Sequence, residues 1–143
     1  MTGALFCLVV AITDGDTLKA RCGEPGAYEQ VTVRLAEIDA PEKRQPFGEA
    51  SRQSLASLCF QKSAAITPTT KDRYGRTVAR VACAGQDASA HQAGTGMAWA
   101  FTRYLTDPEI KRLETAARTA RLGLWRDDQQ TAPWDWRKRS VER

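Results

Sequence analysis

Residues 31–42, VTVRLAEIDAPE, constrain the fold of this chain more than any other stretch. Hydrophobic residues at every second position from 31 to 35 indicate a strand with one buried face. Arg34 lies between two of them, so its side chain points to the opposite face. Pro41 has no backbone N–H and favours an extended residue before it, so we expect the strand to end at the loop that carries Asp39 and Glu42. Taken alone, such a loop is an ordinary acidic turn, but an arginine beside two carboxylates can also hold a phosphate and a hard cation.

A hairpin precedes this strand. Residues 6–13 and 17–22 flank Asp14-Gly15, a dipeptide typical of a two-residue type I′ turn. Around that turn, residues whose numbers sum to 29 lie opposite each other, as Cys7 and Cys22 do. Opposed residues of antiparallel strands have Cα atoms about 4.5–5.5 Å apart, which suits a disulfide. Scattered cysteines are buried thiols in cytosolic proteins and disulfides in exported ones, and the hairpin favours the second interpretation. The expected bridges are Cys7–Cys22 and, by elimination, Cys59–Cys83.

Short strands interleave with helices along the rest of the chain, which predicts an α+β fold whose sheet curls into a small barrel. Asp107-Pro108 marks a helix start, with a capping side chain followed by proline at the first helical position, and Gly123 is placed to end that helix. We expect one domain over residues 1–143, with residues 126–143 as a Trp/Arg-rich C-terminal tail. The predicted strands are residues 6–13, 17–22, a segment from 31 on, 63–70 and 76–83, and the predicted helices are 47–60, a short one ending at 93, and 107–123.

Composition narrows the possible classes of function. The chain has 143 residues, a formal net charge of +4 and a pI near 9.0, which suits an acidic partner such as nucleic acid. No apolar run approaches the roughly 20 residues of a membrane-spanning helix, so we expect no membrane association. A single histidine, His91, to which we assign no role, and the lack of any CxxC pair argue against a zinc site. Residues 4–12 are apolar but follow no basic segment and run into a turn, so we interpret them as a strand and not as a signal peptide.

Three blocks occur in order along the chain: DGDT at residues 14–17, VRLAEIDAPE at 33–42 and KDRYGR at 71–76. DGDT alone is a weak signal, whereas the three blocks together are highly specific. With the later blocks GMAWAFTRY and RLGLW, they resemble the thermonuclease (staphylococcal nuclease-like) family over about residues 10–125. The resemblance implies an OB-type five-stranded β-barrel with three helices. It also implies a calcium-dependent phosphodiesterase that acts on DNA and RNA.

The resemblance also assigns roles to residues. Calcium takes roughly six to eight oxygen ligands, which two carboxylates, a backbone carbonyl, phosphate and water can supply. Arginines offer forked donors to a phosphate, and a carboxylate beside the metal can deprotonate an attacking water. Where the best-known member has threonine this chain has Ala40, which still offers its carbonyl, and Thr102 replaces an aromatic residue of the nucleotide pocket. The implied set is Asp16, Asp39 and the Ala40 carbonyl for the metal, Glu42 as general base, Arg34 and Arg76 for the phosphate, and Tyr74 and Tyr104 for the substrate.

We therefore predict a calcium-dependent, largely sequence-nonspecific endonuclease that hydrolyses DNA and/or RNA and leaves 3′-phosphate ends. We expect a monomer that is periplasmic or secreted, whose signal peptide is not present in this chain. Two alternatives stay open. One is a non-catalytic nucleic-acid-binding OB module, which would typically lack several of these acids and arginines. The other is a nuclease-like component of a DNA-transfer or secretion assembly.

Residues outside the blocks have structural interpretations. Trp99 and Trp125 are expected in the core. Trp134 and Trp136 are expected to pack the tail onto the body, with base stacking as the alternative because basic residues follow them. Glu114 is expected on the solvated face of its helix.

Overall fold

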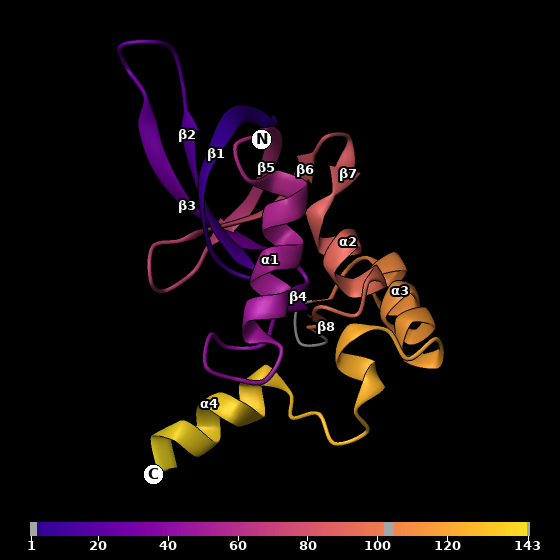
Figure 1. Ribbon diagram of the computed structural model, residues 1–143. Coiled ribbons are helices and arrows are strands. Elements are labelled where there is room, and N and C mark those ends of the chain that lie inside the picture. The colour runs from indigo at the N-terminus through magenta and orange to yellow at the C-terminus, as the bar shows by residue number, and fades with distance from the viewer. Residues whose placement is uncertain (1–2, 102–104, 143) are drawn as a thin grey trace.

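The strands close into a barrel. In the computed structural model, which describes residues 3–101 and 105–142, five strands follow the order β3-β2-β1-β5-β6. Neighbours are antiparallel except β3 and β6, whose parallel pairing of residues 33–35 with 77–79 joins the two ends of the sheet. This confirms the predicted α+β fold with an OB-type five-stranded β-barrel (Figure 1). The strands are β1 (Leu5–Asp14), β2 (Thr17–Cys22), β3 (Glu29–Leu35), β5 (Ser63–Lys71) and β6 (Thr77–Cys83), and β7 (Gln86–Asp87) adds a short hairpin to β6.

The first hairpin has a different turn from the predicted one. Its loop is Gly15-Asp16 instead of Asp14-Gly15, and neither loop residue has the positive φ that a type I′ turn requires. Two bulges in β1 then shift the register by one residue each, so Cys7 still lies opposite Cys22. The structure joins these cysteines in a disulfide with Cα atoms 4.4 Å apart. The predicted pairing is therefore present, although the turn on which the prediction rested is wrong.

The second disulfide joins helix α1 (Gly48–Cys59) to the end of β6. It links Cys59 to Cys83, whose Cα atoms are 5.3 Å apart. Both cysteines are fully buried, and Leu55 and Leu58 of the same helix are buried with them in the main core. α1 is thereby held against the barrel next to β1 (Figure 1).

Two further helices begin after capping aspartates, of which Asp107 is the predicted one. α2 (Ala88–Gly94) follows Asp87, whose carboxylate accepts a hydrogen bond from the N–H three residues on. α3 (Pro108–Thr119) follows Asp107, which accepts from the N–H two residues on. The helix ends earlier than the sequence predicts, because Arg121 takes a left-handed φ of 56° that leaves the helical path. The predicted end at residue 123 is instead the start of a short 3₁₀ helix, Gly123–Arg126.

A fourth helix, α4 (Pro133–Glu142), lies in the predicted tail, so the described chain has one more α-helix than the three expected. Pro133 occupies its first position, where a missing N–H costs nothing. Figure 1 shows α4 beneath the loop that leads into α1. None of the described helices is long and apolar enough to cross a membrane.

The central strand of the sequence analysis is interrupted before its acidic loop. β3 ends at Leu35, Glu37 takes a φ of 71°, and the chain then forms a separate short strand, β4 (Ile38–Asp39). β4 pairs with β8 (Trp99–Ala100), which sets Asp39 opposite Trp99. The alternation of apolar residues does not reveal this turn, which carries Asp39 away from the barrel sheet.

Glu114 of α3 is buried and not solvated, contrary to the expectation. Its side chain is 1% exposed. The N–H of Ala100 donates to it at 2.5 Å, and Lys111 and Arg118 pair with it at 2.8 and 3.3 Å. Glu114 therefore ties α3 to β8.

Aromatic rings gather on the other side of β8. The ring of Trp99 contacts that of Trp125 with centroids 4.7 Å apart, and Trp125 is buried. The ring of Trp134, at the start of α4, lies 5.6 Å from Trp99. Trp134 therefore packs the tail onto the body of the protein.

Candidate active site

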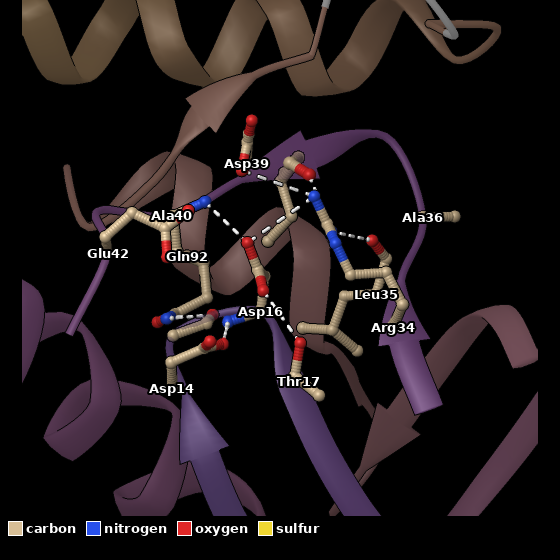
Figure 2. A network of polar contacts seen from close by, with 12 residues as sticks. Asp14, Asp16, Thr17, Arg34, Leu35, Ala36, Asp39, Ala40, Glu42 and Gln92 are labelled. Atoms are coloured by element: carbon tan, nitrogen blue, oxygen red, sulfur yellow. Dashed lines mark hydrogen bonds and ion pairs between the residues drawn. The ribbon is translucent and has the colours of Figure 1, made fainter. Parts of the chain in front are cut away.

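The candidate site begins at the loop of the first hairpin, where Asp16 is held in a buried position (Figure 2). One carboxylate oxygen accepts a hydrogen bond from the N–H of Ala40 at 2.8 Å, and the other accepts from the Thr17 hydroxyl at 2.9 Å. The loop itself is fixed by the buried Gln92 of α2, whose amide donates to the Gly15 carbonyl at 2.7 Å. The position of Asp16 thus depends on three separate segments of the chain.

Gly15 allows this loop to lie against α1. A Cβ atom at this position would lie 1.8 Å from the hydroxyl oxygen of Ser51 and 2.9 Å from the Cβ of Ala40. Any other residue would therefore push the loop away from α1 and displace Asp16. The glycine is required for close approach and not for an unusual φ.

Arg34 is fixed by backbone carbonyls on both sides of the break after β3. Its Nη1 donates to the carbonyls of Leu35 and Ile38 at 2.7 and 2.8 Å. Its Nη2 lies 3.5 Å from a carboxylate oxygen of Asp16 and 3.3 Å from one of Asp39 (Figure 2). Two carboxylates from distant parts of the chain therefore face one cationic group.

The carboxyl groups at this site have perturbed proton affinities. Burial and the Asp16 charge raise the pKa of Asp14, on the same loop, to about 8. Burial also raises the pKa of Asp39, together with the Asp16 charge and in spite of its arginine partners. Burial alone would raise the pKa of Asp16, but Arg34 and the hydrogen bonds to its carboxylate hold that pKa below its usual range. Neighbouring carboxyls whose pKa values are pushed apart are typical of functional sites.

Glu42 lies on the loop after β4 and pairs with an arginine of α4. Nη1 of Arg137 donates to a Glu42 carboxylate oxygen at 2.6 Å, and Nη2 donates to Asp39 at 2.7 Å. The N–H of Glu42 donates to the side-chain oxygen of Gln45 at 3.0 Å, which fixes the loop. The predicted general base and a predicted metal ligand thus share one guanidinium group.

Arg76 and Tyr74 lie at the entrance of β6, next to the strand that holds Arg34. Arg76 pairs with Asp72 at 2.7 Å, and its guanidinium lies 5.5 Å from the ring centroid of Tyr74, which is 69% exposed. Within the described chain, no hydrogen bond or ion pair links either residue to the carboxylate cluster. Tyr104, the other predicted substrate residue, lies outside the described residues.

The donors present fit a hard divalent cation. Asp16 and Asp39 offer carboxylate oxygens and Ala40 offers a backbone carbonyl, with no sulfur or imidazole among them. Burial raises the pKa of Asp39, and a bound cation would favour its ionised form. No group of three or more His, Cys, Asp or Glu side chains among the described residues is arranged to hold a metal. An ion here would therefore need backbone carbonyl, water or phosphate oxygens as well.

Sequence reasoning missed three residues of this site. Asp14 was assigned to turn geometry alone, and Gln92 stood out in no pattern. Arg137 belongs to a basic run that was noted, but nothing local indicates that it reaches Asp39, 98 residues away in sequence. The sequence feature that could have indicated the helix carrying Arg137 is Pro133, because proline is typical of the first position of a helix.

A closed OB-type barrel that carries buried acids and a fixed arginine at one end is the architecture of the staphylococcal nuclease class. Residues 32–127 match the staphylococcal nuclease homologue family, and the chain belongs to that family. It is 42% identical to protein ParB of Escherichia coli over 146 residues, which cover 94% of this chain and 80% of that protein. It is 41% identical to the micrococcal nuclease of Shigella flexneri (92% of this chain, 80% of that protein). An uncharacterized endonuclease of Haemophilus influenzae is 42% identical (92% of this chain, 72% of that protein).

Proposed function

We propose that the protein is a metal-dependent endonuclease that hydrolyses DNA and/or RNA with little regard to sequence, uses calcium and leaves 3′-phosphate ends. The observation that carries the proposal is the convergence of the Asp16 and Asp39 carboxylates on Nη2 of Arg34. Glu42 lies on the following loop and accepts a hydrogen bond from Arg137, which also donates to Asp39. Membership of a nuclease family and relatives named nuclease or endonuclease support it further.

Each residue has a chemical role in this proposal. Held by Asp16, Asp39 and the Ala40 carbonyl, a divalent cation would neutralise phosphate charge and lower the pKa of a nearby water. Glu42 would accept a proton from the attacking water as its oxygen bonds to phosphorus. Arg34, with Arg76, would donate forked hydrogen bonds to the phosphate and stabilise the charge that develops as the bond to the 5′ oxygen breaks. That oxygen would take up a proton from solvent water and leave as a 5′-hydroxyl, and the phosphate would remain on the 3′ side. Tyr74 and Tyr104 are assigned to contact the substrate.

A cleavage assay tests the proposal. Single- and double-stranded DNA and RNA are incubated with the protein in calcium, magnesium or chelator. We expect cleavage with calcium, none with chelator, and ends that a polymerase extends only after removal of a 3′-phosphate. Asp39→Asn should raise the calcium concentration needed for half-maximal activity, whereas Lys138→Gln, which removes a nearby charge, should not. Binding without cleavage in every metal would instead identify a non-catalytic OB module.

We further propose that the protein works in the periplasm or outside the cell. The two disulfides support this, because such bonds persist in oxidising compartments. Non-reducing peptide mapping of protein from an oxidising compartment should recover Cys7–Cys22 and Cys59–Cys83. Four free thiols in that protein would remove the main support for export.

A further inference from the structure

Helix α4 places a positively charged side chain, that of Arg137, on the candidate metal site. Arg137 donates to Asp39 at 2.7 Å and to Glu42 at 2.6 Å. The Asp39 side chain is 1% exposed, whereas that of Arg137 is 45% exposed. One guanidinium, reachable from solvent, therefore covers a buried carboxylate and bridges it to the proposed base.

Other contacts fasten α4 without Arg137. The side-chain amide of Gln45, itself buried, donates to the carbonyl of Thr131, just before the helix, at 2.5 Å. The ring of Trp134 packs against that of Trp99, the residue opposite Asp39 in the β4–β8 pair. The start of α4 can therefore stay attached while Arg137, one helical turn further on, leaves the carboxylates.

Arg137 and a divalent cation would compete for the same carboxylate oxygens of Asp39. Both carboxylate oxygens of Asp39 accept from Arg137, at 2.7 and 3.3 Å, and one of them also faces Arg34 at 3.3 Å. A metal coordinated by Asp39 would lie within a few ångströms of the Arg137 guanidinium. Two positive charges at that separation in a partly buried place repel each other strongly.

We propose that Arg137 is a further residue of the site, a tethered cation that holds Asp39 and Glu42 until a divalent metal displaces it. The inference rests on the metal site of the proposed function. It makes metal affinity a property of the tail as well as of the carboxylates. It also keeps the buried carboxylates paired when no metal is bound.

Calcium titration by calorimetry of the full chain, without nucleic acid, tests the inference. Arg137→Gln removes the competing cation, so its Kd for calcium should fall about two- to fivefold, the range expected for a half-exposed ion pair. Lys138→Gln is the matched control, because Lys138 carries the same charge one residue on and forms none of the ion pairs in the part of the chain that is described. Arg137→Lys, which keeps the charge but not the fork, should fall between wild type and Arg137→Gln. In wild type, calcium should also speed hydrogen exchange in α4.

The outcomes separate this inference from the proposed function. If Asp39→Asn abolishes calcium binding but Arg137→Gln binds no more tightly than Lys138→Gln, Arg137 is not a competitor and only this inference falls. Weaker binding by Arg137→Gln would overturn it as well, because the tail would then support the metal. If Asp39→Asn and Asp16→Asn leave calcium binding unchanged, or wild type binds none, the metal site itself is wrong and both proposals fail.

Discussion

Two arginine–carboxylate clusters lie on neighbouring strands of the barrel and are built from the same residue types. Arg34 on β3 faces Asp16 and Asp39. Arg80 on β6 faces three carboxylates. They are Glu37, Asp87 and Asp107, at 2.6, 3.0 and 3.1 Å.

The acids around Arg80 are satisfied by backbone donors. Glu37 accepts from the N–H groups of Thr106 and Asp107, while Asp87 and Asp107 cap α2 and α3. Burial opposes ionisation of Glu37, but these bonds and Arg80 hold its pKa below the usual range. The cluster holds the first residues of α2 and α3 against the turn after β3, and each of its carboxylates is paired with Arg80.

The acids around Arg34 are close together, and they accept fewer hydrogen bonds from backbone N–H groups than the acids around Arg80. In the described chain, Asp39 accepts hydrogen bonds from the side chains of Arg34 and Arg137. Burial raises its pKa, and burial also raises that of Asp14, which lies beside Asp16. Burial thus disfavours the ionised form of Asp39, and a cation bound beside it would favour that form. Each acid around Arg80 accepts a hydrogen bond from a backbone N–H, whereas Asp39, among the described residues, accepts from arginine side chains, and this difference distinguishes the two clusters.

Glu42→Gln should separate activity from stability most sharply. Glutamine keeps the shape of the side chain but removes the base, so we expect kcat to fall about 10²–10⁴-fold with KM little changed. The free energy of unfolding should change by less than about 0.5 kcal/mol, because the side chain is partly exposed. Steady-state kinetics at saturating calcium and urea unfolding measure the two effects, with Glu49→Gln on the exposed face of α1 as control. A near-wild-type kcat would show that Glu42 is not the general base.

Replacing Arg34 or Arg76 by lysine should have the next largest effect on kcat. Arg34→Lys and Arg76→Lys keep the charge but lose the forked donors, so kcat should fall about 10²–10³-fold. Arg34→Lys should lower the free energy of unfolding more than Arg76→Lys. It breaks the bonds to the Leu35 and Ile38 carbonyls, whereas a lysine at position 76 can still pair with Asp72. Arg80→Lys is the matched control from the structural cluster and should leave the kcat of folded protein unchanged. Equal losses of kcat in Arg34→Lys and Arg80→Lys would erase the distinction between the clusters.

Local patterns predicted the elements of this fold well. Strand alternation, the Asp-Pro helix start and the even cysteine count each reflect short-range rules, and the barrel and both disulfide pairings in the structure agree with them. The break at Glu37 was not predictable in this way, because Thr106 and Arg80, which hold it, are distant in sequence. The burial of Glu114 and the reach of Arg137 to Asp39 depend on tertiary contacts in the same way. The grouping of Arg34 with Asp39 followed from their place in one segment, whereas Asp16 joined that group only through family resemblance.

Arg80→Met should affect stability and not catalysis. It leaves three carboxylates facing one another without their cation, so we expect a loss of about 1–3 kcal/mol in the free energy of unfolding, less than for a fully buried pair because Arg80 is partly exposed. The kcat of the folded fraction should be that of wild type. Arg52→Met removes an exposed ion pair with Glu49 and should cost at most about 1 kcal/mol. An Arg80→Met protein that is as stable as Arg52→Met but slower in cleavage would place Arg80 in the site.

The smallest effect concerns the charge of Asp107. The N–H of Glu109 and then Arg80 hold the pKa of Asp107 below its usual range, so the unfolded chain takes up this proton more readily than the folded one. The ionised carboxylate therefore stabilises the fold above the unfolded pKa of about 3.9, and this contribution is lost as pH falls through the lower folded-state value. Asp107→Asn keeps an oxygen for the helix cap but not the charge. Urea unfolding should show a slightly higher free energy of unfolding for wild type than for Asp107→Asn at neutral pH. This difference should disappear as the pH falls into the acid range. At neutral pH it should also be smaller when both proteins carry the Arg80→Met substitution. A gap that stays constant with pH would mean that Asp107 acts as a cap alone and that charge does not hold the Arg80 cluster together.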